Sequence, residues 1–119
     1  MKNLCKIREL YRSLIDFENQ FIKKYDLCLN EGMLLCKLNE SGKLSSGEIA
    51  ELLKLTFSNT SKVIRSVENK KLVKRILGNE DKRQMYFTLT KAGESKVQSL
   101  DCHLIDLADP LKSYVDQLN

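Results

Sequence analysis

The sequence predicts a mostly α-helical (α+β) domain, and three observations support this fold class. Long stretches at both ends carry apolar side chains at steps of three and four residues, which is the spacing of an amphipathic helix. Two short helices separated by a tight turn are predicted in the middle of the chain, and two strands follow them. A single proline and five glycines in 119 residues favour long helices over an all-β fold.

The N-terminal stretch is predicted to form one long helix over about residues 4–25. Its apolar positions recur three or four residues apart: Leu4, Ile7, Tyr11, Leu14, Phe17, Phe21 and Tyr25. A second helix is expected over about residues 30–40. It should end at Ser41-Gly42, because glycine is common just after the last helical residue.

Capping signals mark the two short helices. Ser45 and Glu48 fit a capping box, in which the hydroxyl accepts from the third helical amide and the carboxylate reaches back. A helix of about eight residues should follow. Thr56 then caps another helix that runs to about Lys70. Its inward side chains are expected to be Thr60, Val63, Ile64 and Val67. Only a short turn around residues 54–55 separates the two helices, which predicts a helix-turn-helix.

Residues 72–77 and 85–89 are predicted to be strands joined by a polar turn, so they form a hairpin. A hairpin that directly follows a helix-turn-helix is a wing. Thr90 is expected to cap a last long helix, with apolar positions close to a heptad seam from Val97 to Leu107. Asp109-Pro110 should interrupt that helix, since aspartate suits a cap and proline the first helical position.

Positive charge gathers in one third of the chain. Residues 54–91 contain ten Lys/Arg and three Asp/Glu, a net charge of +7, whereas residues 1–53 have net charge 0 and residues 92–119 have −3. A clustered basic segment is typical of a site that binds a polyanion. The alternative is a solvated basic face without a partner.

The second helix of the helix-turn-helix presents a polar outer face that suits a DNA major groove. Asparagine and arginine pair with base edges, while serine and lysine more often hold phosphates. The candidate DNA contacts on this helix are Ser58, Asn59, Ser61, Lys62 and Arg65. Phe57 allows two interpretations: a hydrophobic staple at the helix start, which we favour, or a contact to a thymine methyl group.

Lys82 and Arg83 lie at the predicted hairpin tip, where long cations can reach a minor groove. Asp81 next to them would be repelled by phosphate, so its expected role is to hold Arg83 in one rotamer through a charge-assisted hydrogen bond. A charged, solvent-exposed turn is the alternative interpretation of the same three residues.

These features together resemble the MarR family of bacterial winged-helix regulators. The resemblance rests on residues 71–75, 81–83 and 88–93, on the helix-turn-helix over 45–67, and on Leu29-Asn30. It implies a dimer built from the first and last helices, with recognition helices in successive major grooves. It also implies that Arg83 enters a minor groove and that Asp81 orients it. Lys54 and Lys71 depart from the pattern, which usually has glycine at both turns.

We therefore expect a single winged-helix domain over residues 1–119. Residues 1–28 and 91–119 would be dimerisation helices, and 29–90 would be a DNA-binding lobe with its wing at 72–89. The predicted function is sequence-specific duplex-DNA binding by a cytoplasmic homodimer that regulates transcription. Blocking a promoter would make it a repressor, and activation is the alternative mode of regulation. The alternative is a winged-helix module that binds another protein.

Further expectations concern ligands and thiols. A small apolar effector is one possible partner, although side chains at the spacing of its candidate pocket more often form core: Leu10, Leu14, Phe17, Met33 and Cys36. Cys5 is a candidate redox thiol, with an inert thiol the favoured interpretation. Four cysteines without a CxxC pair and a single histidine predict no metal site. We expect no cofactor, no enzymatic activity and no membrane span.

Overall fold

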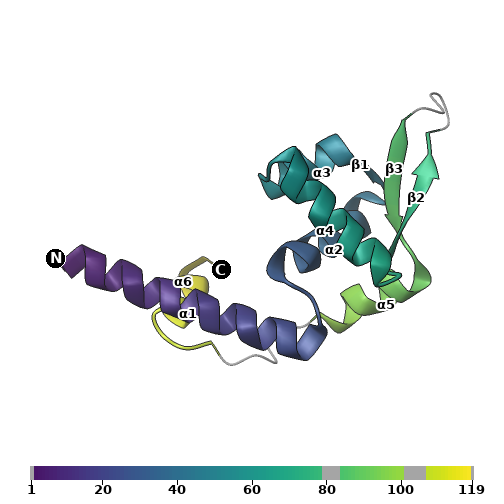
Figure 1. Ribbon diagram of the computed structural model, residues 1–119. Coiled ribbons are helices and arrows are strands. Elements are labelled where there is room, and N and C mark those ends of the chain that lie inside the picture. The colour runs from purple at the N-terminus through teal and green to yellow at the C-terminus, as the bar shows by residue number, and fades with distance from the viewer. Residues whose placement is uncertain (1, 79–83, 101–106, 119) are drawn as a thin grey trace. The chain divides into compact units, whose positions relative to one another are not determined.

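The structure is a computed structural model that describes residues 2–78, 84–100 and 107–118. Mostly helical with one small sheet, it confirms the predicted fold class (Figure 1). The helices and strands, in chain order, are α1 (Lys2–Tyr25), α2 (Leu29–Ser41), β1 (Leu44–Ser45), α3 (Ser46–Leu53), α4 (Phe57–Asn69), β2 (Val73–Leu77), β3 (Met85–Leu89), α5 (Lys91–Ser99) and α6 (Leu111–Leu118). The chain divides into two compact units, one containing α1 and α6 and the other comprising residues 29–100.

The first unit joins α1 to the turn that precedes α6. Ser13 donates a hydrogen bond to the backbone carbonyl of Asp109 at 3.4 Å. The carboxylate of Asp109 accepts at 2.9 Å from the hydroxyl of Ser113, four residues further along the chain. The helix starts at Leu111, one residue after the predicted first position. None of the described helices is both long and apolar enough to cross a membrane.

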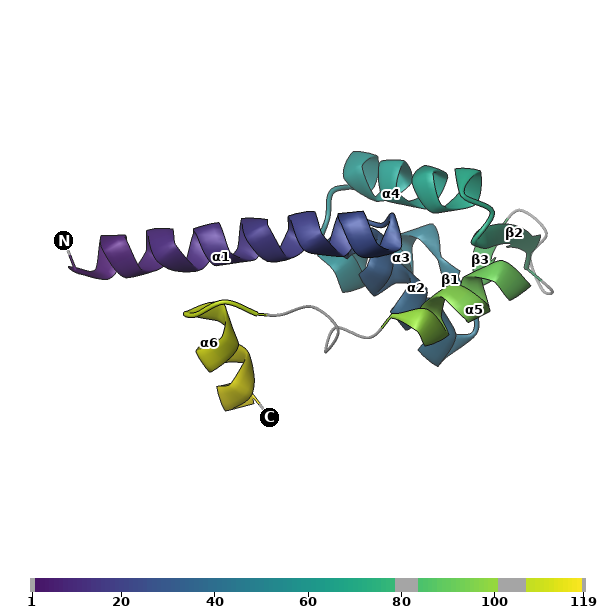
Figure 2. The ribbon, with the colours of Figure 1, turned by 90° about the horizontal axis from the view of Figure 1, so that it is seen from below.

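The second unit is built around α2. This helix contacts both α4 and α5, which lie on its two sides in Figure 2. Leu34, Leu35 and Leu38 of α2 are buried, together with Ile49 of α3 and Val67 of α4. The predicted inward face of α4 is confirmed. The core therefore lies at the meeting point of the helices that form the helix-turn-helix.

The sheet has three antiparallel strands in the order β1–β3–β2. Leu44 of β1 pairs with Phe87 of β3, and Val73 of β2 pairs with Leu89 of β3. All four of these side chains are buried. The wing hairpin is thus attached to the helical core through its base, near residues 73 and 89.

Thr90 and Gly93 lock the start of α5 onto the hairpin base. The Thr90 hydroxyl accepts from the N–H of Gly93 at 3.0 Å, the predicted cap, and donates to the carbonyl of Lys71 at 2.7 Å. A β-carbon added at Gly93 would overlap the backbone carbonyl of Leu72. Glycine is required here because α5 approaches the chain before β2 too closely for any side chain.

The prediction of one long helix from Thr90 to Leu107 is wrong, because the helix does not continue through Leu100. There α5 ends at Ser99, and Leu100 is extended, with φ −76° and ψ 95°. The Ser99 hydroxyl donates to the carbonyl of Lys96 at 2.6 Å, so a side chain takes up an acceptor near the helix end. Accordingly α5 belongs to the compact unit of residues 29–100. The sequence analysis had assigned it, with the rest of residues 91–119, to the dimerisation helices. Residues 101–106 of the expected seam lie outside the described residues.

Two lysines occupy left-handed backbone conformations at helix ends. Lys54 has φ 55° after α3, and Lys71 has φ 64° after α4. The left-handed conformation is easier for glycine, which explains the glycine preference at the corresponding turns of the resembled family. Each lysine costs on the order of 1 kcal/mol relative to glycine at these positions.

Candidate nucleic-acid interface

The N-terminal half of α4 forms an exposed polar surface. The helix begins with Thr56 as its cap, whose hydroxyl accepts from the N–H of Asn59 at 3.1 Å. Its first turn contains no acidic residue. Of the predicted DNA contacts, Ser58, Asn59, Lys62 and Arg65 are exposed and Ser61 is half-buried. The structure therefore places these side chains where a ligand can reach them, and their contact with DNA stays a prediction.

A buried acidic residue that the sequence analysis missed anchors α4 to α2. Glu31, in the first turn of α2, is only 4% exposed. Lys70 donates to both of its carboxylate oxygens at 3.0 and 3.1 Å, and Ser66 donates to one of them at 2.7 Å. The arrangement ties the C-terminal half of α4 to the core. The only signal in the sequence was a glutamate placed two residues before the apolar run of Met33, Leu34 and Leu35.

An ion pair between Arg75 and Glu68, which the sequence analysis also missed, connects α4 to the wing. Arg75 of β2 donates two hydrogen bonds to the carboxylate of Glu68 on α4, at 2.8 and 3.0 Å. These bonds, and the charge of Glu68, raise the pKa of Arg75 above its ordinary value. The guanidinium also lies 5.4 Å from the ring centre of Phe87 on β3. The bidentate ion pair and the cation–π contact together hold the hairpin against α4.

The opposite edge of the hairpin is held by the turn before β1. The ammonium of Lys43 lies 4.8 Å from the ring centre of Tyr86, and Thr88 donates to the carbonyl of Gly42 at 2.6 Å. The described part of the basic segment keeps several cations on the surface: Lys54, Lys62, Arg65, Lys71 and Lys74. The wing candidates Asp81, Lys82 and Arg83 lie outside the described residues.

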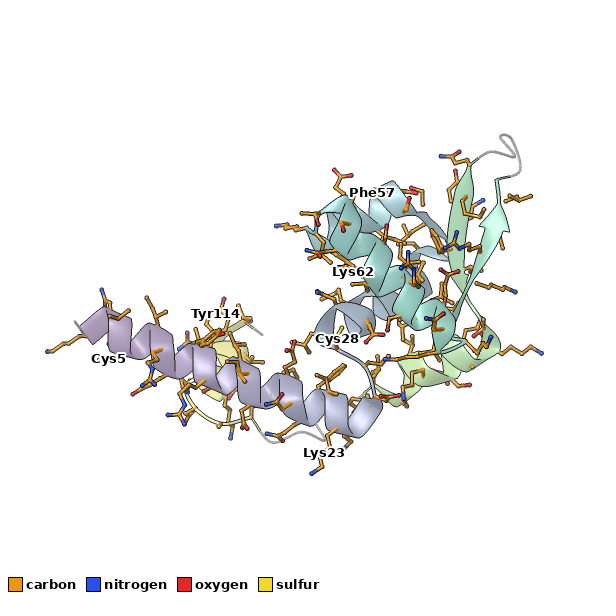
Figure 3. The ribbon with its side chains drawn as sticks, in the orientation of Figure 1. Cys5, Lys23, Cys28, Phe57, Lys62 and Tyr114 are labelled. Carbon is orange, nitrogen blue, oxygen red and sulfur yellow. The ribbon has the colours of Figure 1, made fainter. Side chains whose placement is uncertain are left out.

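Phe57 is not the staple that we favoured. A hydrophobic staple uses the residue before the cap, which is Leu55, whereas Phe57 is the first helical residue after Thr56. Its side chain is 71% exposed, and Figure 3 shows it at the N-terminal end of α4. An apolar side chain with so much exposed surface does not fasten the helix start.

The other candidates are divided between the two units. Leu10, Leu14 and Phe17 lie on α1, and Met33 and Cys36 on α2, so the apolar effector pocket stays a prediction. Cys5 is exposed on α1 (Figure 3), and its redox role is also untested. A groove in the first unit is lined largely by polar residues, including Glu9, Arg12, Asp16, Asn19 and Asp109, and by none of the five predicted pocket residues.

The arrangement of residues 29–100 defines the class of protein. Helices α3 and α4 are joined by a tight turn, and the β2–β3 hairpin follows and pairs with β1 (Figure 1). This is a winged helix-turn-helix. Residues 27–85 match the model of the MarR family, a range that contains α2, the helix-turn-helix and the first wing strand. Residues 27–85 therefore form a MarR-family domain.

Individual relatives are more distant. The chain is 28% identical over 92 residues to the uncharacterized HTH-type transcriptional regulator YpoP of Bacillus subtilis (strain 168), an alignment covering 77% of this chain and 64% of YpoP. It is 26% identical over 95 residues to the similarly described YwaE of the same organism, covering 76% of this chain and 56% of YwaE. The chain thus spans less than two thirds of the length of either relative.

Solved structures show the same fold. A mutant of MarR from E. coli complexed with operator DNA superposes with a TM-score of 0.71 at 15% sequence identity, covering 98% of this chain and 92% of that one. At this level of identity the likeness establishes the fold alone. The protein in that structure was crystallised in complex with operator DNA.

Proposed function

We propose that this protein is a sequence-specific duplex-DNA-binding transcriptional regulator and not an enzyme. The observation that carries the proposal is the exposed polar face of α4, anchored behind by Glu31 and beside the wing by Arg75. The MarR-family domain and the likeness to an operator-bound structure support it. The net charge of +7 over residues 54–91 supports a polyanionic partner.

In this proposal α4 enters the major groove of the duplex. A major groove admits one α-helix, and residues near the N-terminus of that helix reach the base edges. Arg65 and Asn59 carry side chains that pair bidentately with guanine and adenine, whereas Ser58 and Lys62 suit phosphates. Lys82 and Arg83 would extend the contact into a flanking minor groove, with Asp81 orienting the arginine.

The proposed regulator is a homodimer. Leu4, Ile7 and Tyr11 form a stripe on α1 and are 67%, 63% and 61% exposed. Tyr114 and Leu118 of α6, in the same unit, are also exposed. Contiguous apolar side chains on a surface mark a site of protein association, and a second copy of the same chain would cover them. Two recognition helices would then bind an inverted repeat, and occupation of a promoter would cause repression.

The test is selection from a pool of random duplex DNA by the purified full chain at physiological salt. We expect enrichment of an inverted repeat with half-sites about one helical turn apart. Binding to the selected duplex should weaken steeply with added salt, because neutralised phosphates release counterions. Enrichment of no motif would contradict the proposal and favour a winged-helix module that binds protein.

A further inference from the structure

Phe57 is the most exposed of the large apolar side chains that the structure describes. It is the first residue of α4, directly after the cap at Thr56, and its ring lies at the N-terminal end of the helix (Figure 3). Among the described residues, the paired aromatic rings all lie on α1, and none of these pairs includes Phe57. The fold does not use this ring, so its surface is available to a ligand.

The helical position of Phe57 places it on the surface proposed to contact DNA. Residues four apart lie one above the other on a helix, so Phe57, Ser61 and Arg65 form one row. Ser58 and Lys62 form the neighbouring row. Phe57 therefore continues the polar face of α4 to the end of the helix that reaches deepest toward base edges in helix-turn-helix complexes.

The chemistry of the Phe57 side chain limits which group on a ligand it can contact. A phenyl ring makes no conventional hydrogen bond, and the apolar group that a major groove offers is the 5-methyl of thymine. The surroundings favour an anionic partner, since the exposed cations Lys62 and Arg65 share the face and the first turn of α4 has no acidic residue. A major groove combines thymine methyl groups with flanking phosphates, so it matches both features.

We propose that Phe57 is a specificity-determining residue that packs against the 5-methyl group of one thymine in each operator half-site. This inference rests on the proposed function, because it requires a sequence-specific DNA complex. It adds a thymine requirement to the base contacts that the polar side chains of α4 supply.

The test exchanges single thymines for deoxyuridine, which removes only the 5-methyl group from the duplex. In the operator obtained by selection, each thymine of one half-site is replaced in turn and the affinity of the full chain is measured. We expect one position at which deoxyuridine weakens binding about fourfold, equivalent to ~0.8 kcal/mol for one buried methyl-sized group. Phe57→Ala should bind the thymine and deoxyuridine duplexes with equal affinity.

Three controls accompany the measurement. Phe57→Leu keeps an apolar side chain and should retain part of the preference for thymine. Leu52→Ala truncates another exposed apolar residue, on α3, and should retain the preference in full. The melting temperature of Phe57→Ala should stay close to that of the wild type, because the ring is exposed and truncating it opens no cavity.

Two results would overturn the inference while leaving the proposed function intact. One is a wild-type chain that binds the selected operator with the same affinity whichever thymine loses its methyl group. The other is a Phe57→Ala variant that keeps the wild-type ratio between thymine and deoxyuridine duplexes. Absence of any sequence-specific duplex would instead overturn the proposed function, and this inference with it.

Discussion

Several single residues occupy positions that tolerate few side chains. Gly93 lies where α5 touches the backbone before β2, and Lys71 holds a left-handed conformation at the end of α4. Both belong to the short segment from 71 to 93 that connects the recognition helix, the wing and α5. The geometry of the proposed DNA interface therefore depends on backbone conformation at individual positions as well as on side-chain packing.

Gly93→Ala should destabilise the protein by about 1–3 kcal/mol, because the new methyl group would overlap the carbonyl of Leu72 and push α5 away from the hairpin. Chemical denaturation would measure the change. Gly47→Ala is the matched control: it is also helical, and the nearest atom to its β-carbon would be the Ser45 hydroxyl at 4.0 Å. That variant should be neutral or slightly more stable, since alanine favours the helix. Equal effects at both glycines would contradict the packing argument.

At the scale of elements, two ionic contacts decide how α4 sits. The Glu31 cluster joins it to α2, and the Glu68–Arg75 pair joins it to β2. The first is mostly buried and the second is more exposed, so they contribute differently to stability. Breaking the buried contact should cost more stability, because the partner left behind inside the protein has lost its hydration and gained no hydrogen bond in exchange.

Glu31→Ala should lower the free energy of unfolding by about 2 kcal/mol or more, because it removes the acceptor of three hydrogen bonds, all from Ser66 and Lys70. Urea denaturation monitored by circular dichroism would measure the loss. Glu40→Ala provides the control, since Glu40 makes an exposed pair with Lys37 at 3.6 Å, and its removal should change stability by less than about 0.5 kcal/mol. A Glu31→Ala variant as stable as the control would refute the anchoring role.

The capping box of α3 predicts a pH dependence. The backbone N–H of Ser45, and then its hydroxyl, hold the pKa of Glu48 below its ordinary value of 4.5. A carboxylate with a lowered folded-state pKa stabilises the fold at pH values above its unfolded pKa and loses that contribution as the pH falls through the folded value. The stability difference between the wild type and Glu48→Gln should therefore be constant near neutral pH and shrink below 4.5.

Melting temperatures recorded for both chains from neutral pH downward would test this expectation. The effect belongs to an exposed helix end, so the difference should be small at every pH. A difference that persists unchanged well below pH 4.5 would show that the Glu48 carboxylate gains nothing from its ionised state in the folded protein.

At the scale of the whole molecule, the exposed apolar stripe of α1 governs the proposed assembly. Leu4, Ile7 and Tyr11 lie three and four residues apart, so they share one side of the helix. The chain alone leaves them in water. A dimer that covers them would couple two recognition helices to one inverted repeat.

Ile7→Glu should shift the protein toward the monomer, because a carboxylate in an apolar interface loses its hydration. Sedimentation velocity over a range of concentrations would report the association. Affinity for the full inverted repeat should fall toward that for a single half-site. Lys23→Glu, an exposed change near the other end of α1 (Figure 3), should leave the association unchanged. An Ile7→Glu chain that sediments like the wild type would exclude this stripe from the interface.

Local interactions were open to prediction from the sequence alone. The caps at Ser45, Thr56 and Thr90 each join a side chain to a backbone group three residues away, so neighbouring residue types are enough to indicate them. The same holds for the apolar periodicity of α1 and α4. These signals predicted the order of the helices and strands and the outward position of Ser58, Asn59, Lys62 and Arg65 on α4.

Tertiary structure decided what depends on residues far apart in the chain. Glu31 meets Ser66 and Lys70 across 35 and 39 positions, a distance over which the sequence pattern carries no information about pairing. The end of α5 at Ser99 broke a heptad spacing that alone favoured a longer helix. The exposure of Phe57 likewise depends on the tertiary structure, because the other segments pack into a core that does not include its ring. Periodicity and capping thus determined which segments fold and how each is oriented, whereas burial, set by the packing of all segments together, decided which side chains anchor the recognition helix and which remain free for a ligand.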